Sequence, residues 1–533
     1  MKKILLPIII SLLMSSPAIL NAQKTAEGTV YVDNNNNGEL DGNEERLFGV
    51  AVSNGSDVVK TNEDGEYSIQ INEDDATIFV IKPAGYRLPV NELNQPQFYY
   101  IHTPDGSPEL EFDGVEPTGP LPEAINFPLL EDVQKNEFSV LLFGDPQPYT
   151  EREVEYFDKD IVSELEGTEE YEFGITLGDI VGDDLDLFQP YIESVSKIGL
   201  PWFHVYGNHD MNFDANSDSL ADETFEATFG PPTYSFNHGN AHFIVLDDVV
   251  YPREDGESGY IGGFTDKQFE FIKNDLEYVS EDQLVVIAFH IPIFMPDGWG
   301  RTFRIENRDR LFDLLKKYPN TLTLSAHTHI QKFHFFDDKD EWKRLEPHIH
   351  YNVGTTNGDW WSGQVDERGI PPTLMRDGTP NGYAMLNIEG NEYTIDYKVA
   401  DKPEDYRLSK WGPEIVPQDS WHGAELYVNY FLGNEYTEVE FRVQNEWESW
   451  RPMNKVEEQD PHVTKLRQKW DTADELPEEG RRPSNPIQSS HLWKAGVPNN
   501  LPLGEHTIEI RVTDMFGRTF TDEFKYEIVE PNQ

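Results

Sequence analysis

The fold of this chain is decided by residues 173–183, which read FGITLGDIVGD. The first part, Phe173 to Leu177, is an uninterrupted apolar run with the length of a buried strand. Gly178 then allows a sharp turn, and the carboxylates of Asp179 and Asp183 follow at once. A buried strand that ends in acidic side chains is typical of an α/β domain whose ligand site lies at the carboxyl ends of its strands.

The same arrangement recurs through the middle of the chain. Further buried-strand runs cover residues 139–143, 202–206, 242–246, 284–289 and 321–324. Segments with a helical period lie between them, and the best marked begins at Thr265, where Thr265 and Gln268 form a capping-box pattern ahead of an apolar face. Strands that alternate with helices predict a layered α/β domain.

Polar side chains that can bind metals follow five of these strands. The clusters are Asp145-Pro146-Gln147, Asp179 with Asp183, Asn208-His209, His290, and His327-Thr328-His329. Asp, Asn, Gln and His offer the oxygen and nitrogen ligands that suit Mn, Fe, Zn or Mg. Because strand ends of one domain face one crevice, we expect a site that holds two metals about 3.5–4 Å apart, with a shared carboxylate and a bridging hydroxide.

Each cluster also has a purely structural explanation. A Gly-Asp pair is usually a turn, and Asn-His-Asp alone is compatible with a helix cap or a satisfied polar network. Five such clusters, all at strand ends and all between residues 144 and 329, favour one shared metal site over five unrelated turns.

Together these clusters resemble the signature of the calcineurin-like metallophosphoesterases, and the close match covers about a third of the chain. The resemblance implies an αββα sandwich as the catalytic domain. The β-rich regions on either side resemble the N- and C-terminal accessory domains of one bacterial branch of that family. The expected fold is therefore an α/β catalytic domain flanked by two small β-sandwich domains.

The resemblance also implies roles for individual residues. One metal would be held by Asp145, Gln147, Asp179 and His329. Asp179 would bridge to a second metal, which Asn208, His290 and His327 would complete. His209 would lie beside the substrate oxygen as a general acid or hydrogen-bond donor, and Asp183 would orient its ring.

One residue departs from the commonest form of the family, which has Asp-x-His in its first cluster. Here Gln147 stands in the place of the histidine. An amide oxygen is a harder and weaker ligand than imidazole, so the first metal is expected to bind more loosely, or to be Mn or Mg rather than Fe or Zn. An Asp-Pro-Gln form resembles one branch of the family, which includes a eukaryotic protein phosphatase.

The domain boundaries follow from changes in pattern along the chain. We expect a signal peptide at 1–22, an N-terminal β-sandwich at 24–130, the metallophosphoesterase domain at 135–402 and a C-terminal β-sandwich at 410–533. Within the last domain, the charged and Pro-containing stretch 454–485 is expected to be a long exposed loop.

The N-terminal domain carries a separate motif. Its residues fit a twelve-residue calcium loop with Gly38 at the turn, and the candidate ligands are Asp33, Asn35, Asn37, Glu39, Asp41 and Glu44. Strand-like flanks exclude a helix–loop–helix hand and resemble calcium loops of bacterial surface β-sandwiches. An Asn-Gly-rich hairpin turn is the alternative interpretation.

Candidate substrate contacts follow the His290 strand. Arg301, Arg304 and Arg308 are close together in an acidic chain, and guanidinium groups match phosphate geometry, so they are candidates together with Trp299. The alternative is a solvated helix start whose arginines pair with neighbouring acids. Trp360 and Trp361 form a candidate wall for an organic leaving group, with buried core tryptophans as the alternative.

Composition narrows the partners and the location. The 533 residues carry 42 Lys and Arg against 98 Asp and Glu, a net charge of −56, and no cysteine. This charge argues against general nucleic-acid binding, and the absence of cysteine excludes disulfides, thiolate metal ligands and cysteine nucleophiles. Two lysines before a short apolar run predict an exported protein, periplasmic or secreted, with no transmembrane segment in the mature chain.

These observations favour a secreted metal-dependent phosphoesterase that cleaves a phosphomonoester or phosphodiester by attack of a metal-bridging hydroxide. Its substrate would be a phosphorylated small molecule, a glycan, a lipid head group or a phosphoprotein. Two alternatives remain open from the sequence. One is a non-catalytic exported binding protein with a vestigial metal site, and the other is a pyrophosphatase that acts on a nucleotide sugar or lipid head group.

Overall fold

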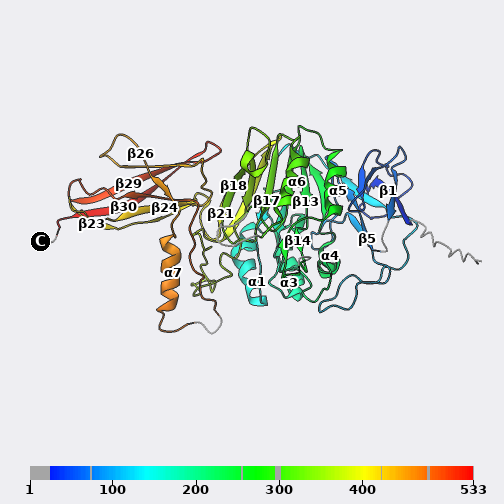
Figure 1. Cartoon of the computed structure of the whole chain (residues 1–533), viewed down its shortest axis with the longest axis horizontal. Coiled ribbons are helices and arrows are strands. Elements are labelled where there is room, and N and C mark those ends of the chain that lie inside the picture. Colours follow the sequence, from blue (N-terminus) through cyan, green and yellow to red (C-terminus); the bar gives the residue numbers. More distant parts are fainter. Residues whose placement is uncertain are drawn as a thin grey trace, which may run out of the picture.

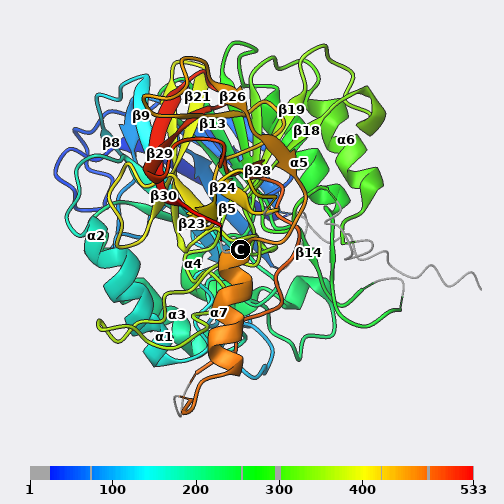
Figure 2. The same cartoon turned by 90° about the vertical axis from the view of Figure 1, so that its left-hand side faces the viewer.

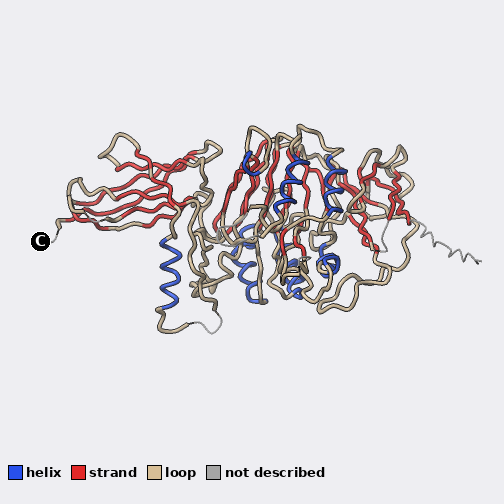
Figure 3. Tube along the Cα trace, in the orientation of Figure 1, coloured by secondary structure: helices blue, strands red, loops and turns tan. Residues whose placement is uncertain are grey.

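The structure is a computed structural model, and it describes residues 24–71, 75–253, 256–294, 302–421, 423–476 and 480–531. A β-rich part, an α/β part and a second β-rich part follow one another along the longest axis (Figure 1). Figure 3 shows the helices gathered in the middle part, with α7 (Pro461–Asp471) as the exception. The predicted fold class is confirmed. The expected signal segment, 1–22, lies outside the described residues.

Two mixed sheets form the middle of the molecule. The first has the order β11-β10-β9-β20-β21, and the second has the order β12-β13-β16-β17-β19-β18. Their faces meet through aromatic rings: the centroids of Phe173 and Phe243 lie 5.3 Å apart, and those of Phe203 and Phe236 4.2 Å apart. The strands are β9 (Glu137–Phe143), β10 (Phe173–Leu177), β11 (Trp202–Val205), β12 (Tyr234–His238), β13 (Ala241–Val245), β16 (Leu284–Ala288), β17 (Thr321–Ser325), β18 (Lys332–Phe336), β19 (His348–Asn352), β20 (Gly382–Glu389) and β21 (Glu392–Val399).

Helices cover the outer face of each sheet, which completes an αββα sandwich. Figure 2 shows α1 and α3 on one side and α5 and α6 on the other. Phe157 of α1 packs 5.8 Å from Phe143 of β9, and Phe312 of α6 packs 5.5 Å from His348 of β19. The bounds are α1 (Glu151–Phe157), α2 (Ser163–Leu165), α3 (Phe188–Val195), α4 (Glu223–Phe229), α5 (Asp266–Leu276) and α6 (Ile305–Leu315). The capping box predicted at Thr265 and Gln268 begins α5.

The strands that precede the polar clusters run parallel within each sheet. In the first sheet β9, β10 and β11 are parallel, and in the second β13, β16, β17 and β19 are parallel. A single bridge between Gly144 after β9 and Thr355 after β19 joins the carboxyl ends of the two sheets. The loops that follow these strands therefore meet at one edge of the sandwich.

The N-terminal part is built from two four-stranded sheets, β4-β1-β8-β6 and β3-β2-β5-β7. It rests against the middle part through Phe79 of β5, whose ring lies 5.7 Å from that of Phe271 on α5. The strands are β1 (Lys24–Val32), β2 (Ala51–Ser53), β3 (Val58–Lys60), β4 (Glu66–Ile71), β5 (Ala76–Ile81), β6 (Tyr86–Arg87), β7 (Tyr99–His102) and β8 (Phe127–Glu131).

The C-terminal part pairs a sheet of order β22-β24-β28-β27 with one of order β23-β30-β29-β25-β26. It is joined to the middle part by a buried ion pair, His491 Nε2 to Asp377 at 3.0 Å. The strands are β22 (Leu408–Trp411), β23 (Ile415–Pro417), β24 (Glu425–Tyr430), β25 (Glu438–Val443), β26 (Arg451–Pro452), β27 (Asn454–Val456), β28 (Leu492–Gly496), β29 (Gly504–Thr513) and β30 (Thr519–Val529).

The middle part also contains a separate two-stranded sheet, formed by β14 (Val249–Val250) and β15 (Ile261–Gly262).

The stretch 454–485 is more ordered than the predicted long loop. It contains β27 and α7, and α7 begins at Pro461, directly after Asp460, whose side chain caps the helix by accepting the backbone N–H of His462. Aspartate as N-cap followed by proline is a favourable helix start, so the proline begins structure here rather than excluding it. None of the described helices is long and apolar enough to cross a membrane.

Candidate metal centre

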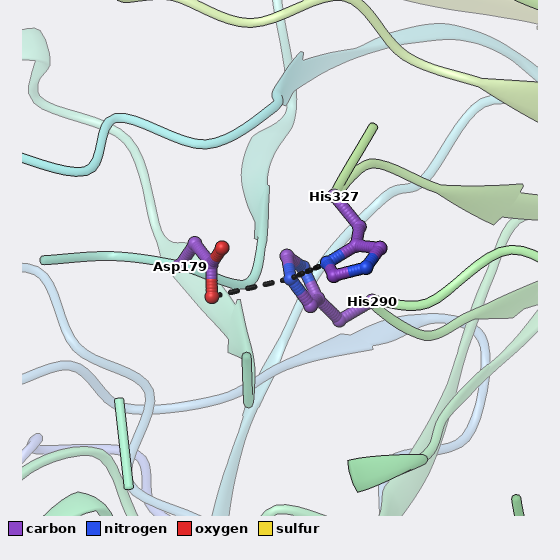
Figure 4. Close-up of side chains that lie close together, drawn as sticks. All are labelled: Asp179, His290 and His327. Atoms are coloured by element: carbon purple, nitrogen blue, oxygen red, sulfur yellow. Dashed lines mark hydrogen bonds and ion pairs between the residues drawn. The ribbon is translucent and has the colours of Figure 1, made fainter. Parts of the chain in front are cut away.

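His290 lies at the centre of the polar clusters. Its Nε2 is 3.1 Å from Asp179 Oδ1, 3.2 Å from Asn208 Oδ1 and 3.2 Å from His327 Nδ1. Figure 4 shows the side chains of Asp179, His290 and His327 converging from three loops. On the other side of the ring, His290 Nδ1 donates to the carbonyl of Leu177 at 2.8 Å, which directs Nε2 into the cluster.

These contacts fit a metal better than they fit a hydrogen-bond network. Asp179, His290 and His327 each place a ligand atom within 4.8 Å of the others, and all three are buried. Two ligands bound to one cation at about 2.1 Å lie roughly 3.0–3.4 Å apart, the range seen around His290 Nε2. His290 Nε2 and His327 Nδ1 face each other, and two ring nitrogens in this arrangement can both bind one cation. The donor set therefore fits the expected metals.

The remaining candidate ligands lie beside this cluster. The carboxylate of Asp145 accepts the backbone N–H of His327 at 3.0 Å and lies 4.0 Å from His290 Nε2. Gln147 Nε2 is 3.4 Å from Asp179 Oδ2, while its carbonyl oxygen accepts the indole N–H of Trp360 at 2.6 Å. That oxygen has a second lone pair, so the hydrogen bond leaves it able to ligate.

His329 is the last of the predicted metal ligands. Its Nδ1 lies 3.3 Å from the carbonyl of Gly358, and its ring packs 4.2 Å from that of Trp360. Donation from Nδ1 to the carbonyl leaves Nε2 unprotonated, as a metal ligand requires. The structure thus brings the predicted metal ligands of all five clusters to one edge of the sandwich.

The backbone at the centre is held in an unusual conformation. Asp145, Gln147, Asp179, His327 and His329 have φ angles of 34°, 41°, 48°, 68° and 53°. Non-glycine residues adopt the left-handed region at a cost of roughly 1–2 kcal/mol each, and such strain gathers at functional sites. Gly207 allows the close packing that holds this conformation, because a Cβ there would lie 2.0 Å from the backbone nitrogen of Asp179.

Charge is poorly balanced in the centre as it stands. Burial raises the pKa of Asp145 well above its usual value, and burial lowers the pKa of His327 well below it. Burial also acts to lower the pKa of His290, but Asp179 outweighs it and raises that pKa to about 10. A divalent cation would repel these protons and lower every one of these pKa values, leaving carboxylates and neutral imidazoles as ligands.

His209 and Asp183 form a pair at the mouth of the centre. His209 Nδ1 lies 2.5 Å from Asp183 Oδ1, and the backbone N–H of His209 donates to Asp179 Oδ1 at 2.8 Å. Burial acts to lower the pKa of His209, but Asp179 and Asp183 outweigh it and raise that pKa to about 9. The hydrogen bond to Asp183 leaves Nε2 of the partly exposed ring free to face a ligand.

Two buried carboxylates hold the ligand loops in place: Asp210, which ends the cluster Asn208-His209-Asp210, and Asp248, which was not predicted from the sequence. Asp248 accepts the backbone N–H groups of His290 at 3.0 Å and Ile291 at 2.9 Å, and Asp210 accepts those of Val181 at 3.1 Å and Gly207 at 2.9 Å. Asp248 carried the same signal as the chosen clusters, since it closely follows the strand at 242–246.

The arginine prediction is wrong for Arg308. Its guanidinium pairs with Asp309 at 2.9 Å and packs over Phe336, which is registered with His348 at the start of β19, whereas the centre lies beyond the end of that strand. Arg304 precedes α6, and its side-chain stem packs against Gly263. Trp299 and Arg301 lie outside the described residues.

The two tryptophans of the predicted wall separate. Trp360 packs on His329 and bonds to Gln147, so it lies against the centre. Trp361 is buried 5.8 Å from the ring of Tyr156 on α1, as the core alternative expected.

Two tyrosines also line the centre. Tyr149 lies 6.2 Å from the ring of His209, and Tyr260 lies 6.1 Å from that of His327. Burial raises the pKa of each phenol, and the nearby carboxylates, Asp183 for Tyr149 and Asp179 for both, raise it further.

The loop at 33–44 closes on itself around two carboxylates. Asp33 accepts the backbone N–H groups of Asn35, Asn37 and Gly38 at 3.3, 3.2 and 2.8 Å. Glu44 folds back to accept those of Asn34 at 3.1 Å and Asp41 at 2.9 Å. Burial and Asp33 together raise the pKa of the Tyr31 phenol beside this loop.

An αββα sandwich whose parallel strands converge on a metal donor set defines a metallophosphoesterase. Comparison with protein-family models supports this class. The model of the calcineurin-like phosphoesterase domain matches residues 138–331. Models of the N-terminal and C-terminal parts of calcineurin-like phosphoesterases match residues 34–115 and 350–520. The chain belongs to the calcineurin-like phosphoesterase family, and membership of that family implies a site for two divalent metals.

Similar proteins include a 3',5'-cyclic-nucleotide phosphodiesterase from Nostoc sp., 24% identical over 164 residues, or 31% of this chain and 52% of the relative. The chain thus spans about half the length of that curated relative. Among solved structures, a dimetal phosphatase from Danio rerio is 15% identical with a TM-score of 0.36, covering 49% of this chain and 95% of the other. A purple acid phosphatase from yellow lupin (Lupinus luteus) is 13% identical with a TM-score of 0.36, covering 66% of each chain.

Proposed function

We propose that this enzyme is exported and hydrolyses a phosphomonoester or phosphodiester at the centre around His290. The observation that carries the proposal is the convergence of Asp179, Asn208 and His327 on His290 Nε2 at 3.1–3.2 Å, with His209 at the mouth. Two divalent metals bound there would polarise the phosphoryl oxygens and lower the pKa of a water molecule near the phosphorus.

The residues of this chain have separate tasks in the proposal. Asp145, Gln147 and His329 would hold one metal, Asn208, His290 and His327 would hold the other, and Asp179 would be shared by both. His209 faces the ester oxygen and donates a proton or hydrogen bond to it, and Asp183 holds the His209 ring in the required tautomer. The amide of Gln147 favours Mn or Mg at its position over Fe or Zn.

The test measures hydrolysis by the purified mature protein after metal removal and reloading. We expect 4-nitrophenyl phosphate or bis(4-nitrophenyl) phosphate to be cleaved with Mn²⁺ and two bound metals per chain, and at least about 100-fold more slowly after chelation. The panel includes a 3',5'-cyclic nucleotide, the substrate class in the name of the Nostoc relative. Two bound metals without cleavage of any ester on the panel would favour a binding protein instead.

We also propose that the loop at 33–44 binds calcium through Asp33, Asn35, Asn37, Glu39, Asp41 and Glu44. Asp33 and Glu44 already hold the loop in a closed turn through backbone N–H groups. Millimolar Ca²⁺ is expected to raise the melting temperature of the wild type by a few degrees and that of Asp33→Ala not at all. A thermal melt of both proteins checks this, with Asp64→Ala, in another Asn-Gly turn of the same domain, as control. Equal shifts in wild type and Asp33→Ala would contradict the proposal.

A further inference from the structure

Arg481 of the C-terminal part reaches over the mouth of the metal centre. Its guanidinium lies 4.8 Å from the ring centroid of Tyr149 and 6.0 Å from that of Trp360. The backbone on both sides is fastened to the loop that carries Trp360: Gly363 donates to the carbonyl of Arg481 at 2.9 Å, and Ser484 donates to the carboxylate of Asp359 at 2.6 Å. The position of Arg481 is therefore built into the contact between the two parts.

The two rings beneath Arg481 touch the metal centre directly. Tyr149 packs 6.2 Å from His209, and Trp360 packs 4.2 Å from His329. The indole of Trp360 also donates to the oxygen of Gln147. Only one layer of side chains thus separates the guanidinium from the residues that would hold the metals and face the ester.

Arg481 differs from its neighbour in making no direct ion pair with a carboxylate of the described residues. Arg482 forms a two-point ion pair with Asp471, at 2.7 Å from both Nε and Nη2. Burial raises the pKa of the nearby Glu153 and the charge of Arg481 acts to lower it; this carboxylate does not bond to the guanidinium and accepts the backbone N–H of Tyr149 at 2.6 Å. In a chain with 98 acidic residues and 42 Lys and Arg, a half-buried arginine whose guanidinium bonds to no described carboxylate has N–H groups available for a bound anion.

We propose that Arg481 is a substrate-binding residue that the C-terminal part supplies, and that it binds anionic oxygens of the substrate phosphate. The guanidinium lies over the rings of Tyr149 and Trp360, and neither ring accepts its N–H groups in a hydrogen bond, so these groups remain to bind oxygens, which they match in geometry. A doubly charged phosphomonoester gains more from this contact than a singly charged diester. The inference rests on the proposed phosphoesterase activity and gives the C-terminal part a role in substrate selection.

The experiment compares full-length, Mn-loaded wild type with Arg481→Gln, Arg481→Lys and the matched control Arg482→Gln. For Arg481→Gln we expect the KM for 4-nitrophenyl phosphate to rise at least about 10-fold with kcat within about threefold, and a smaller rise for bis(4-nitrophenyl) phosphate. Calorimetric titration with inorganic phosphate is expected to show a similar rise in Kd. Arg481→Lys is expected to lie between wild type and Arg481→Gln, and Arg482→Gln to match wild type.

An unchanged phosphate Kd in Arg481→Gln, or an equal loss in Arg482→Gln, would overturn the proposal. So would a loss confined to kcat. Should the wild type cleave none of the esters, the proposed function fails, while the phosphate titration still decides the role of Arg481. If a thermal melt shows that Arg481→Gln does not fold, the phosphate titration is made with Arg481→Lys instead. This variant keeps the charge but loses the planar fork, so its Kd for phosphate is still expected to exceed that of the wild type.

Discussion

Replacing Asp179 by asparagine is expected to lower kcat/KM at least about 1000-fold and to leave fewer than two metals per chain. The carboxylate uses both oxygens: Oδ1 lies 3.1 Å from His290 Nε2 and accepts the backbone N–H of His209, and Oδ2 lies 3.4 Å from Gln147. Asparagine keeps the shape and one oxygen, but it removes the charge and the second oxygen that a shared ligand of two cations requires. The measurements are steady-state kinetics and metal content.

The matched control is Asp186→Asn, the same substitution at an exposed carboxylate seven residues further along the chain, in the short 3-10 helix Leu185–Leu187. Its kinetics and metal content are expected to equal those of the wild type, because it contacts none of the ligands. Circular dichroism of both variants shows whether the fold is kept. An Asp179→Asn variant that folds, binds two metals and retains a tenth of the wild-type kcat/KM would contradict the bridging role.

Much of the centre could be predicted because its signals are local. A buried strand, a tight turn and a polar residue are neighbours in the sequence, and parallel strands carry such neighbours to one edge without further information. This is why the side chains proposed as metal ligands, from Asp145 to His329, lie at one edge of the sandwich. Asp248 could have been found by the same rule, since it follows β13 closely.

The outer part of the site could not be predicted in the same way. Tyr149, Trp360 and Arg481 belong to segments more than 100 residues apart. The first two meet within the middle part, and only the contact with the C-terminal part adds Arg481. Arg308 was predicted to contact the substrate and does not lie near the centre. Several arginines close together in the sequence do not show which face of a helix each one occupies. The structure turns Arg308 toward Phe312 and Asp340, away from the centre.

The pair of His209 and Asp183 is where the proposed chemistry can be separated from metal binding. His209→Asn is expected to lower kcat at least about 100-fold while metal content stays at the wild-type level, because the His209 ring contacts Asp183 and Tyr149 rather than His290 or His327. Asp183→Asn is expected to lower kcat less, by about 10-fold, because it keeps the His209 ring and disturbs only the tautomer and orientation of that ring. The measurement is kcat and KM for both variants alongside metal content.

A matched control for the histidine is His506→Asn on β29, where the ring bonds to the carbonyl of Pro502 and lies far along the chain from the centre. Its kinetics are expected to be unchanged. Loss of metal from His209→Asn would make His209 a ligand and contradict the separation of roles. Because the leaving group of 4-nitrophenyl phosphate needs little protonation, a donor role at the ester oxygen also predicts a larger loss for an alkyl phosphate than for the aryl ester. Equal losses on both would instead favour stabilisation of the phosphoryl oxygens by the His209 ring.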